Sequence, residues 1–230
     1  MLSNLFFNLF ELFFPDYCIN CKESIQNKRK YLCLSCLADL PLTHFSFQGG
    51  NDIEISFKGR IPVCAATSLL YFEQKGLVQK LIHELKYRNK PQIGNFLGQW
   101  LGEEMILSKR FEQIDYVVPV PLHPAKEKER GYNQVDCFAA SLAKVLKSEL
   151  KLDLLRKVSN SSTRSLLDRQ QRTMGSTSEF VLNKLSLVEN KHILLVDDVI
   201  TSGATMKACA DSLGAASSLK ISLASMAFTP

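Results

Sequence analysis

The sequence predicts an α/β fold in which helices cover a parallel sheet, with a small cysteine-rich module in front of it. From about residue 61, strand-like apolar runs alternate with helical patterns. Four of the seven cysteines lie within residues 18–36, and the stretch between the two regions is polar and contains glycine. We therefore divide the chain into a helix and cysteine module at 1–45, a connector at 46–60 and an α/β domain at 61–230.

The composition is that of an ordinary globular protein. Of 230 residues, 46% are hydrophobic and 22% are charged, which excludes a disordered chain, a collagen-like fibre and a small disulfide scaffold. No apolar run reaches the roughly 18 residues needed to cross a bilayer, so we expect no transmembrane segment and a cytoplasmic location. The net charge is +5. Residues 147–172, with seven basic and three acidic side chains, contribute +4 of it and predict an exposed basic loop.

The first third of the α/β domain contains a strand pattern followed by two helical ones. The apolar run IPVCAATSLLYF at 61–72 predicts one or two strands. In 77–87, apolar residues recur every three or four positions, which predicts an amphipathic helix. The segment 93–106 predicts a second helix.

The middle of the domain predicts a strand, a long helix and another strand. YVVPV at 116–120 and LDLLRKV at 152–158 are the strands, and 133–150 is the helix. Asn133 is a candidate N-cap, with Asp136 three residues further on.

The last third repeats the strand and helix alternation. HILLVDD at 192–198 predicts a buried strand, ATMKACADSLGA at 204–215 a helix, and LKISLASMAF at 219–228 a final strand. Parallel strands need crossover connections, usually helices, so this alternation predicts a parallel sheet.

The N-terminal stretch MLSNLFFNLFELFF, residues 1–14, predicts an amphipathic helix. It has no basic start and is followed by no small-residue cleavage site, so it does not resemble a signal peptide. We expect the helix to dock on the rest of the protein. Binding to a membrane surface or a partner is the alternative.

Four cysteines have the spacing C-x2-C-x11-C-x2-C, which is typical of a structural zinc site. They are Cys18, Cys21, Cys33 and Cys36. The polar segment between the pairs cannot supply a core, so a bound Zn²⁺ would supply the folding free energy. Two disulfides or a redox pair are the alternative, which a reducing cytosol disfavours. Cys64, Cys137 and Cys209 stand in apolar contexts and are expected to be buried.

The segment ILLVDDVITSGATM, residues 193–206, carries the strongest functional signal. An apolar strand ends in Asp197 and Asp198, and a loop of small and hydroxyl residues leads into a helix. The loop and the helix N-terminus offer backbone N–H groups to a phosphate dianion. The carboxylates would repel that phosphate unless they bind ribose hydroxyls or a divalent cation. The pattern therefore favours a sugar phosphate ligand; the alternative is an ordinary connection in which Asp forms a turn.

This stretch resembles the signature with which phosphoribosyltransferases bind the ribose 5-phosphate part of phosphoribosyl pyrophosphate. The resemblance implies that Asp197 and Asp198 hold the ribose hydroxyls and have the catalytic role of stabilising positive charge on the ring. It also implies Mg²⁺ bound with phosphoribosyl pyrophosphate. The implied 5-phosphate loop consists of Thr201, Ser202, Gly203, Ala204 and Thr205.

Nearly the whole chain is similar to the ComF family, because further motifs occur in the family's order. After the four cysteines come Leu85-Lys86-Tyr87, Pro119 to Leu122, Arg130-Gly131-Tyr132-Asn133-Gln134, a basic loop at 159–172 and the phosphoribosyl signature. The resemblance implies a type I phosphoribosyltransferase-like parallel sheet with flanking helices, plus a small N-terminal zinc-binding module.

The resemblance also implies roles for residues outside the signature. Pro121 and Leu122 match the pyrophosphate loop. The alternative interpretation is that this segment is a plain structural turn. Arg130 would neutralise pyrophosphate and Tyr132 would stack on a base, unless the two form only a helix-entry motif. The remaining candidates are Lys86 as an anion contact or an ordinary surface lysine, and Arg169 and Arg172 in a mobile lid over pyrophosphate.

Three functions follow as hypotheses. The first is a protein that binds phosphoribosyl pyrophosphate and supports uptake or processing of single-stranded DNA in natural transformation, with competence helicase-type proteins as partners. The second is an active phosphoribosyltransferase on an unidentified base or amine acceptor. The third is a scaffold that binds phosphoribosyl pyrophosphate as a regulatory ligand.

Overall fold

The fold is described by a computed structural model of the chain. It describes residues 16–25, 31–88, 90–158, 179–183, 187–214 and 218–230. The expected helix at 1–14 and the lid residues Arg169 and Arg172 lie outside these described residues. Within the described part of the chain, we find no helix with the length and apolarity that a membrane span requires.

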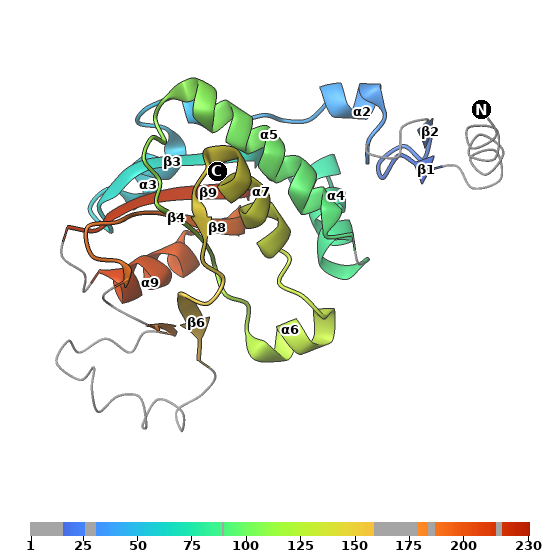
Figure 1. Ribbon diagram of the computed structural model, residues 1–230. Coiled ribbons are helices and arrows are strands. Elements are labelled where there is room, and N and C mark those ends of the chain that lie inside the picture. Colours follow the sequence, from blue (N-terminus) through green and yellow to red (C-terminus); the bar gives the residue numbers. More distant parts are fainter. Residues whose placement is uncertain (1–15, 26–30, 89, 159–178, 184–186, 215–217) are drawn as a thin grey trace, which may run out of the picture.

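A five-stranded, all-parallel sheet forms the centre of the molecule, as the alternation of elements predicts (Figure 1). The strand order is β3-β9-β8-β4-β5. The strands are β3 (Val63–Tyr71), β4 (Tyr116–Pro119), β5 (Glu149–Leu150), β8 (His192–Ile200) and β9 (Lys220–Phe228). β8 is central and pairs with β9 on one side and β4 on the other, so the ends of all three strands lie at one edge.

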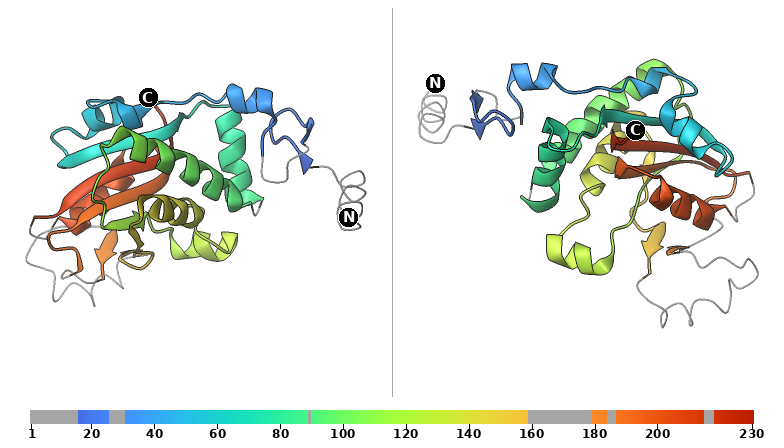
Figure 2. Two further views of the ribbon diagram at one scale, coloured as in Figure 1. Left: turned by 45° about the horizontal axis from the view of Figure 1, so that its top comes forward. Right: turned by 180° about the vertical axis from the view of Figure 1, so that it is seen from behind.

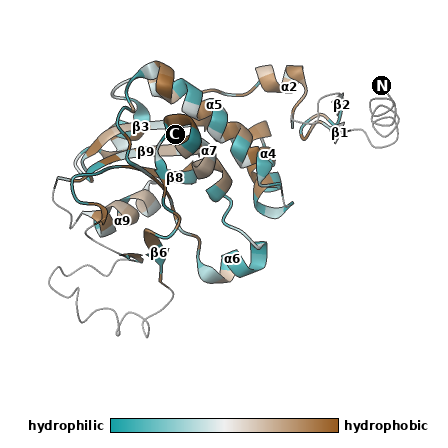
Figure 3. Cartoon of the chain, in the orientation of Figure 1, coloured by the Kyte–Doolittle hydropathy of each residue, from teal (hydrophilic) through white to brown (hydrophobic). Residues whose placement is uncertain are grey.

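Helices cover both faces of the sheet because successive side chains of a strand point to opposite faces. Leu194 and Val196 of β8 pack into one core, whereas Ile193 and Leu195 pack into the other. The first core is covered by α4 (Leu77–Tyr87), α5 (Gln92–Ser108) and α7 (Asp136–Leu146), and the second by α3 (Asp52–Phe57) and α9 (Ala204–Leu213). Figure 2 shows the helices on the two sides of the strands, and Figure 3 shows polar residues along α6 (Pro124–Arg130).

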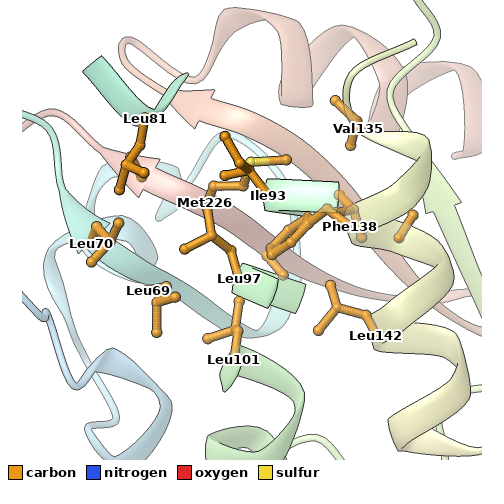
Figure 4. Packing of buried hydrophobic residues seen from close by; sticks show 14 of the residues in the cluster. Leu69, Leu70, Leu81, Ile93, Leu97, Leu101, Val135, Phe138, Leu142 and Met226 are labelled. Atoms are coloured by element: carbon orange, nitrogen blue, oxygen red, sulfur yellow. The ribbon is translucent and has the colours of Figure 1, made fainter. Parts of the chain in front are cut away.

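Helix α5 lies directly against α7 because three glycines face its neighbour. Gly94, Gly98 and Gly102 are spaced one turn apart, and a Cβ on any of them would lie within 3.1 Å of an α7 atom. Leu97 and Leu101 on α5 and Phe138 on α7 are fully buried beside them (Figure 4). Close approach of the two backbones therefore fixes how α7 is placed against α5.

The long helix predicted at 133–150 is shorter in the structure. α7 spans Asp136–Leu146, and a left-handed Lys147 ends it, so that Glu149 and Leu150 join the sheet as β5. Asn133 is not the N-cap residue: its side-chain amide donates to the backbone oxygen of Val120 at 3.1 Å. The cap position is Val135, and the Asn133 side-chain oxygen accepts the Val135 N–H at 3.3 Å.

The strand predicted at 152–158 lies outside the main sheet. It is shortened to β6 (Leu155–Lys157) and pairs antiparallel with β7 (Phe180–Leu182), which was not predicted. The two strands flank the segment that contains most of the basic loop.

The predicted connector at 46–60 is a packed part of the domain. It continues from the 3-10 helix η1 (Phe45–Phe47) into α3. The Asn51 amide donates to the backbone oxygen of Ala66 at 2.8 Å, and Glu54 accepts from the Arg110 guanidinium at 2.5 Å. These bonds tie the segment to β3 and to the chain after α5.

The cysteine module lies beside α4 (Figures 1 and 2). It contains β1 (Asp16–Tyr17), β2 (Ser24–Ile25) and α2 (Leu34–Ala38). Cys18 and Cys36 are buried in the core that also includes α4, and Lys80 on α4 donates to the Asn20 side chain at 2.8 Å. Of the lone cysteines, Cys209 is buried as expected, Cys137 is half-buried, and Cys64 is exposed, which contradicts its prediction.

Replacing Gly98 by Ala is expected to destabilise the protein by about 1–3 kcal/mol. The new Cβ would lie 2.6 Å from the backbone oxygen of Phe138 and 2.9 Å from the Cβ of Ser141, and a backbone atom cannot move aside alone. Gly214→Ala is the control, because its Cβ would meet its nearest neighbour at 3.5 Å. Urea unfolding measures both variants. A Gly98→Ala protein as stable as the parent would contradict the tight α5–α7 contact.

Candidate functional site

Two carboxylates lie near the carboxyl end of the central strand. The structure extends β8 through Asp197 and Asp198 to Ile200, two residues beyond the predicted strand. Ligands of parallel α/β folds bind at this edge of the sheet. Asp198 is buried, whereas Asp197 is half-buried. The two side chains therefore have different surroundings.

The Asp198 carboxylate is held by two side chains from distant segments. Its Oδ2 accepts from Lys86 Nζ at 2.8 Å and from Gln134 Nε2 at 2.7 Å. Gln134 in turn accepts from Arg130 Nη1 at 2.7 Å. The predicted residues Lys86, Arg130 and Asp198 therefore form one network, and Gln134 is the link that residue-by-residue prediction missed although it stands in the RGYNQ motif.

Asp197 has a different electrostatic environment. Burial and the neighbouring Asp198 carboxylate raise the pKa of Asp197 well above the usual range of an aspartate, and the Lys86 and Lys157 charges only partly offset this. Its Oδ1 accepts the backbone N–H of Asp198 at 2.8 Å. A cation or a hydroxyl donor placed here would relieve the repulsion between the carboxylates.

The predicted phosphate loop joins β8 to α9 as a short exposed turn. Thr201, Ser202, Ala204 and Thr205 are exposed, whereas Gly203 is buried with a φ of 71° and precedes the first residue of α9. Left-handed glycine followed by right-handed helical residues aims successive N–H groups at one concave place, which suits an anion. The α9 dipole adds partial positive charge at the same end.

The segment after β4 continues from a strand that pairs with β8 just before Asp197. Pro119 pairs with Val196, and the Val120 N–H donates to the Val196 oxygen at 2.8 Å. Pro121 and Leu122 follow as half-exposed residues and lead into α6, which the sequence did not predict as a helix. The structure thus places both predicted loop residues next to the carboxyl end of β8.

Tyr132 and Tyr87 flank the network that contains Arg130. The Tyr132 hydroxyl donates to the backbone oxygen of Leu85, and burial raises the pKa of Tyr132. Tyr87 is 57% exposed, its hydroxyl accepts from Arg130 Nη2 at 3.2 Å, and the guanidinium carbon lies 5.0 Å from its ring centroid. Tyr87 is therefore the more open aromatic surface here, and the stacking role of Tyr132 stays a prediction.

The four predicted zinc ligands come together in the structure. Their sulfur atoms all lie within 4.8 Å of one another, and those of Cys21 and Cys33 are 3.6 Å apart. Four thiolates about 2.3 Å from a tetrahedral Zn²⁺ would be separated by about 3.8 Å, so the donor set fits that ion. All four are free thiols, which does not match the disulfide alternative.

Comparison with known proteins gives results for both the domain and the whole chain. A family model described as "Phosphoribosyl transferase domain" matches residues 137–230. The DNA utilization protein YhgH of Salmonella typhimurium is 30% identical over 195 residues, which are 82% of this chain and 80% of that protein. The chain belongs to the ComF family. The α/β part of this ComF protein has the phosphoribosyltransferase fold, a parallel sheet with flanking helices.

Two further similarities have lower identity. Competence protein F of Haemophilus influenzae is 24% identical over 209 residues, which are 84% of the ComF chain described here and 89% of that protein. Among solved structures, one titled "structure of the allosteric regulatory enzyme of purine biosynthesis" matches with a TM-score of 0.43 and 18% identity. That match covers 63% of this chain and 30% of the other.

Metal analysis of the purified ComF protein is expected to find about one Zn²⁺ per chain. Changing Cys18 and Cys36 to Ser should remove the metal and destabilise the module, because its strands have only two residues each and the ion would join the two cysteine pairs. Cys64→Ser is the control, since that thiol is exposed and far along the chain from the cluster. A protein without metal, or one with disulfides between these cysteines, would contradict the zinc site.

Proposed function

We propose that this protein binds phosphoribosyl pyrophosphate with Mg²⁺ at the carboxyl end of β8. The observation that carries the proposal is the junction of β8 and α9, where two carboxylates stand beside a loop of small residues with a left-handed Gly203. Asp197 and Asp198 would hold the ribose hydroxyls, and the loop from Thr201 to Thr205 would hold the 5-phosphate.

Pyrophosphate would lie toward the segment after β4. Pro121 and Leu122 lie beside the end of β8, and the Lys86 and Arg130 cations reach the same network. Mg²⁺ supplies positive charge that stabilises a pyrophosphate group in such sites. Ionised Asp197 would be favoured once a cation or hydroxyl groups lie beside it, so binding is accompanied by proton release from this carboxyl at pH values below its raised pKa.

We further propose that the protein, with phosphoribosyl pyrophosphate bound, takes part in uptake or processing of single-stranded DNA. The names of two relatives, a DNA utilization protein and a competence protein, support this role. The structure adds the exposed Tyr87 ring beside Arg130, a pairing suited to an unstacked base and a backbone phosphate. The partners would be competence helicase-type proteins, and the protein would act in the cytoplasm.

The alternative is turnover with a base or amine acceptor. The same carboxylates and loop would serve an active phosphoribosyltransferase, with the carboxylates stabilising charge on the ribose ring. A screen of acceptor bases for pyrophosphate release distinguishes turnover from binding alone. Release that depends on one acceptor would favour the enzyme.

Asn in place of both Asp197 and Asp198 should weaken phosphoribosyl pyrophosphate binding by at least about 100-fold, because two charged hydrogen-bonding groups are lost. Isothermal titration calorimetry in Mg²⁺ measures the affinity, and thermal unfolding verifies that the variant is folded. The control changes Asp39 and Asp153, two exposed carboxylates, to Asn. Unchanged affinity in the site variant would show that the site assignment is wrong.

Affinity for single-stranded DNA should fall steeply with salt, and loss of Arg164, Arg169 and Arg172 should lower both the affinity and its salt dependence. Fluorescence anisotropy with a labelled oligonucleotide from about 50 to 200 mM salt measures both quantities. The control removes three other charges by changing the exposed residues Lys58, Lys75 and Lys109 to Gln. Absent or salt-independent binding would reject the DNA role while leaving phosphoribosyl pyrophosphate binding intact.

A further inference from the structure

One cation contacts the phosphate loop from outside the region that the family model matches. Arg60 follows α3, and its Nη1 donates to the backbone oxygen of Ser202 at 3.0 Å and to that of Ser56 at 3.3 Å. The contact with Ser202 joins residues 142 positions apart. Within the described ranges, no carboxylate lies at ion-pair distance from Arg60. Its charge is therefore directed to the loop and not to an acidic neighbour.

Phe57 holds the next residue of the same loop. Its ring is fully buried, and a Cβ on Gly203 would lie 2.5 Å from the ring Cζ and 2.9 Å from Cε1. The guanidinium carbon of Arg60 lies 5.3 Å from the centroid of this ring. The end of α3 thus contacts the loop at two consecutive residues, Ser202 through a hydrogen bond and Gly203 through packing.

The orientation of one peptide unit follows from these contacts. In a trans peptide the C=O and N–H bonds point in opposite directions. Because the Ser202 oxygen points at Arg60, the N–H of Gly203 points away from Arg60. With Gly203 left-handed and α9 right-handed, that N–H is one of the donors proposed to hold the anion. A flipped peptide would place a carbonyl oxygen there, which would repel a phosphate.

We propose that Arg60 is a positioning residue that locks the Ser202–Gly203 peptide with its N–H toward the bound 5-phosphate. The proposal rests on the proposed function for the identity of that anion. It gives the segment at 46–60, which the sequence predicts as a connector, a specific part in ligand binding.

The first experiment compares affinities for ribose 5-phosphate and for Mg²⁺-pyrophosphate by calorimetry. Arg60→Ala should lower the affinity for ribose 5-phosphate by about tenfold, which corresponds to one charge-assisted hydrogen bond, and leave the affinity for pyrophosphate unchanged. Arg60→Lys should recover most of the affinity because an ammonium group also donates to a carbonyl. Lys58→Ala is the matched control: it removes the same charge two residues away, at an exposed side chain.

The second experiment needs no ligand. The backbone ¹⁵N relaxation of Gly203 should show one rigid orientation in the parent protein and in Lys58→Ala, and added motion or a second signal in Arg60→Ala. The unfolding midpoint should stay unchanged in all three proteins, because Arg60 is exposed.

The outcomes separate this proposal from the proposed function. Three results would each overturn the positioning role. Arg60→Ala could bind ribose 5-phosphate as tightly as the parent protein does, or it could lose as much affinity for pyrophosphate as for ribose 5-phosphate. The third result is a Gly203 signal that is the same in Arg60→Ala and in the parent. If the parent binds neither ribose 5-phosphate nor phosphoribosyl pyrophosphate, the proposed function fails. In that case a changed Gly203 signal in Arg60→Ala would still support the lock on the peptide.

Discussion

The arrangement of the site depends on the need to pair one buried carboxylate. Asp198 is almost completely buried, and an isolated charge there would cost several kcal/mol. Its Oδ2 is satisfied by Lys86 from α4 and by Gln134 from the turn before α7. Three segments that are far apart in the sequence therefore meet at one atom at the end of β8, and with them come Tyr87 and Arg130.

Packing far from the carboxylates supports this meeting point. The backbone of α7 approaches α5 so closely that a Cβ on Gly94 would lie 3.1 Å from the Phe138 nitrogen. Phe138 is in the first turn of α7, so this contact sets the position of the turn that carries Asn133 and Gln134. The Asn133 amide then ties that turn to the end of β4 through Val120. Core packing thus determines where the polar groups of the site stand.

Two parts of the chain before β3, the cysteine module and α3, are both connected to the site. The cysteine module contacts α4 through Asn20 and Lys80, and the other end of the same helix carries Lys86. On the opposite face, α3 contacts the phosphate loop through Phe57 and Arg60. The chain before the sheet therefore contributes to both cores, the cysteine module to the one shared with α4 and α3 to the one shared with α9.

Local patterns in the sequence determined most of the elements and the chemistry of the loop. The apolar run before Asp197, the small residues around Gly203 and the paired cysteines each depend on neighbours in the chain, so the parallel sheet, the β8–α9 loop and the clustered thiols were predictable. Tertiary structure alone decided that Asn133 bonds to Val120, that Glu149 starts a strand, and that Arg60 reaches Ser202. These contacts join residues with no local pattern in common, and burial and close packing select them only after the chain has folded.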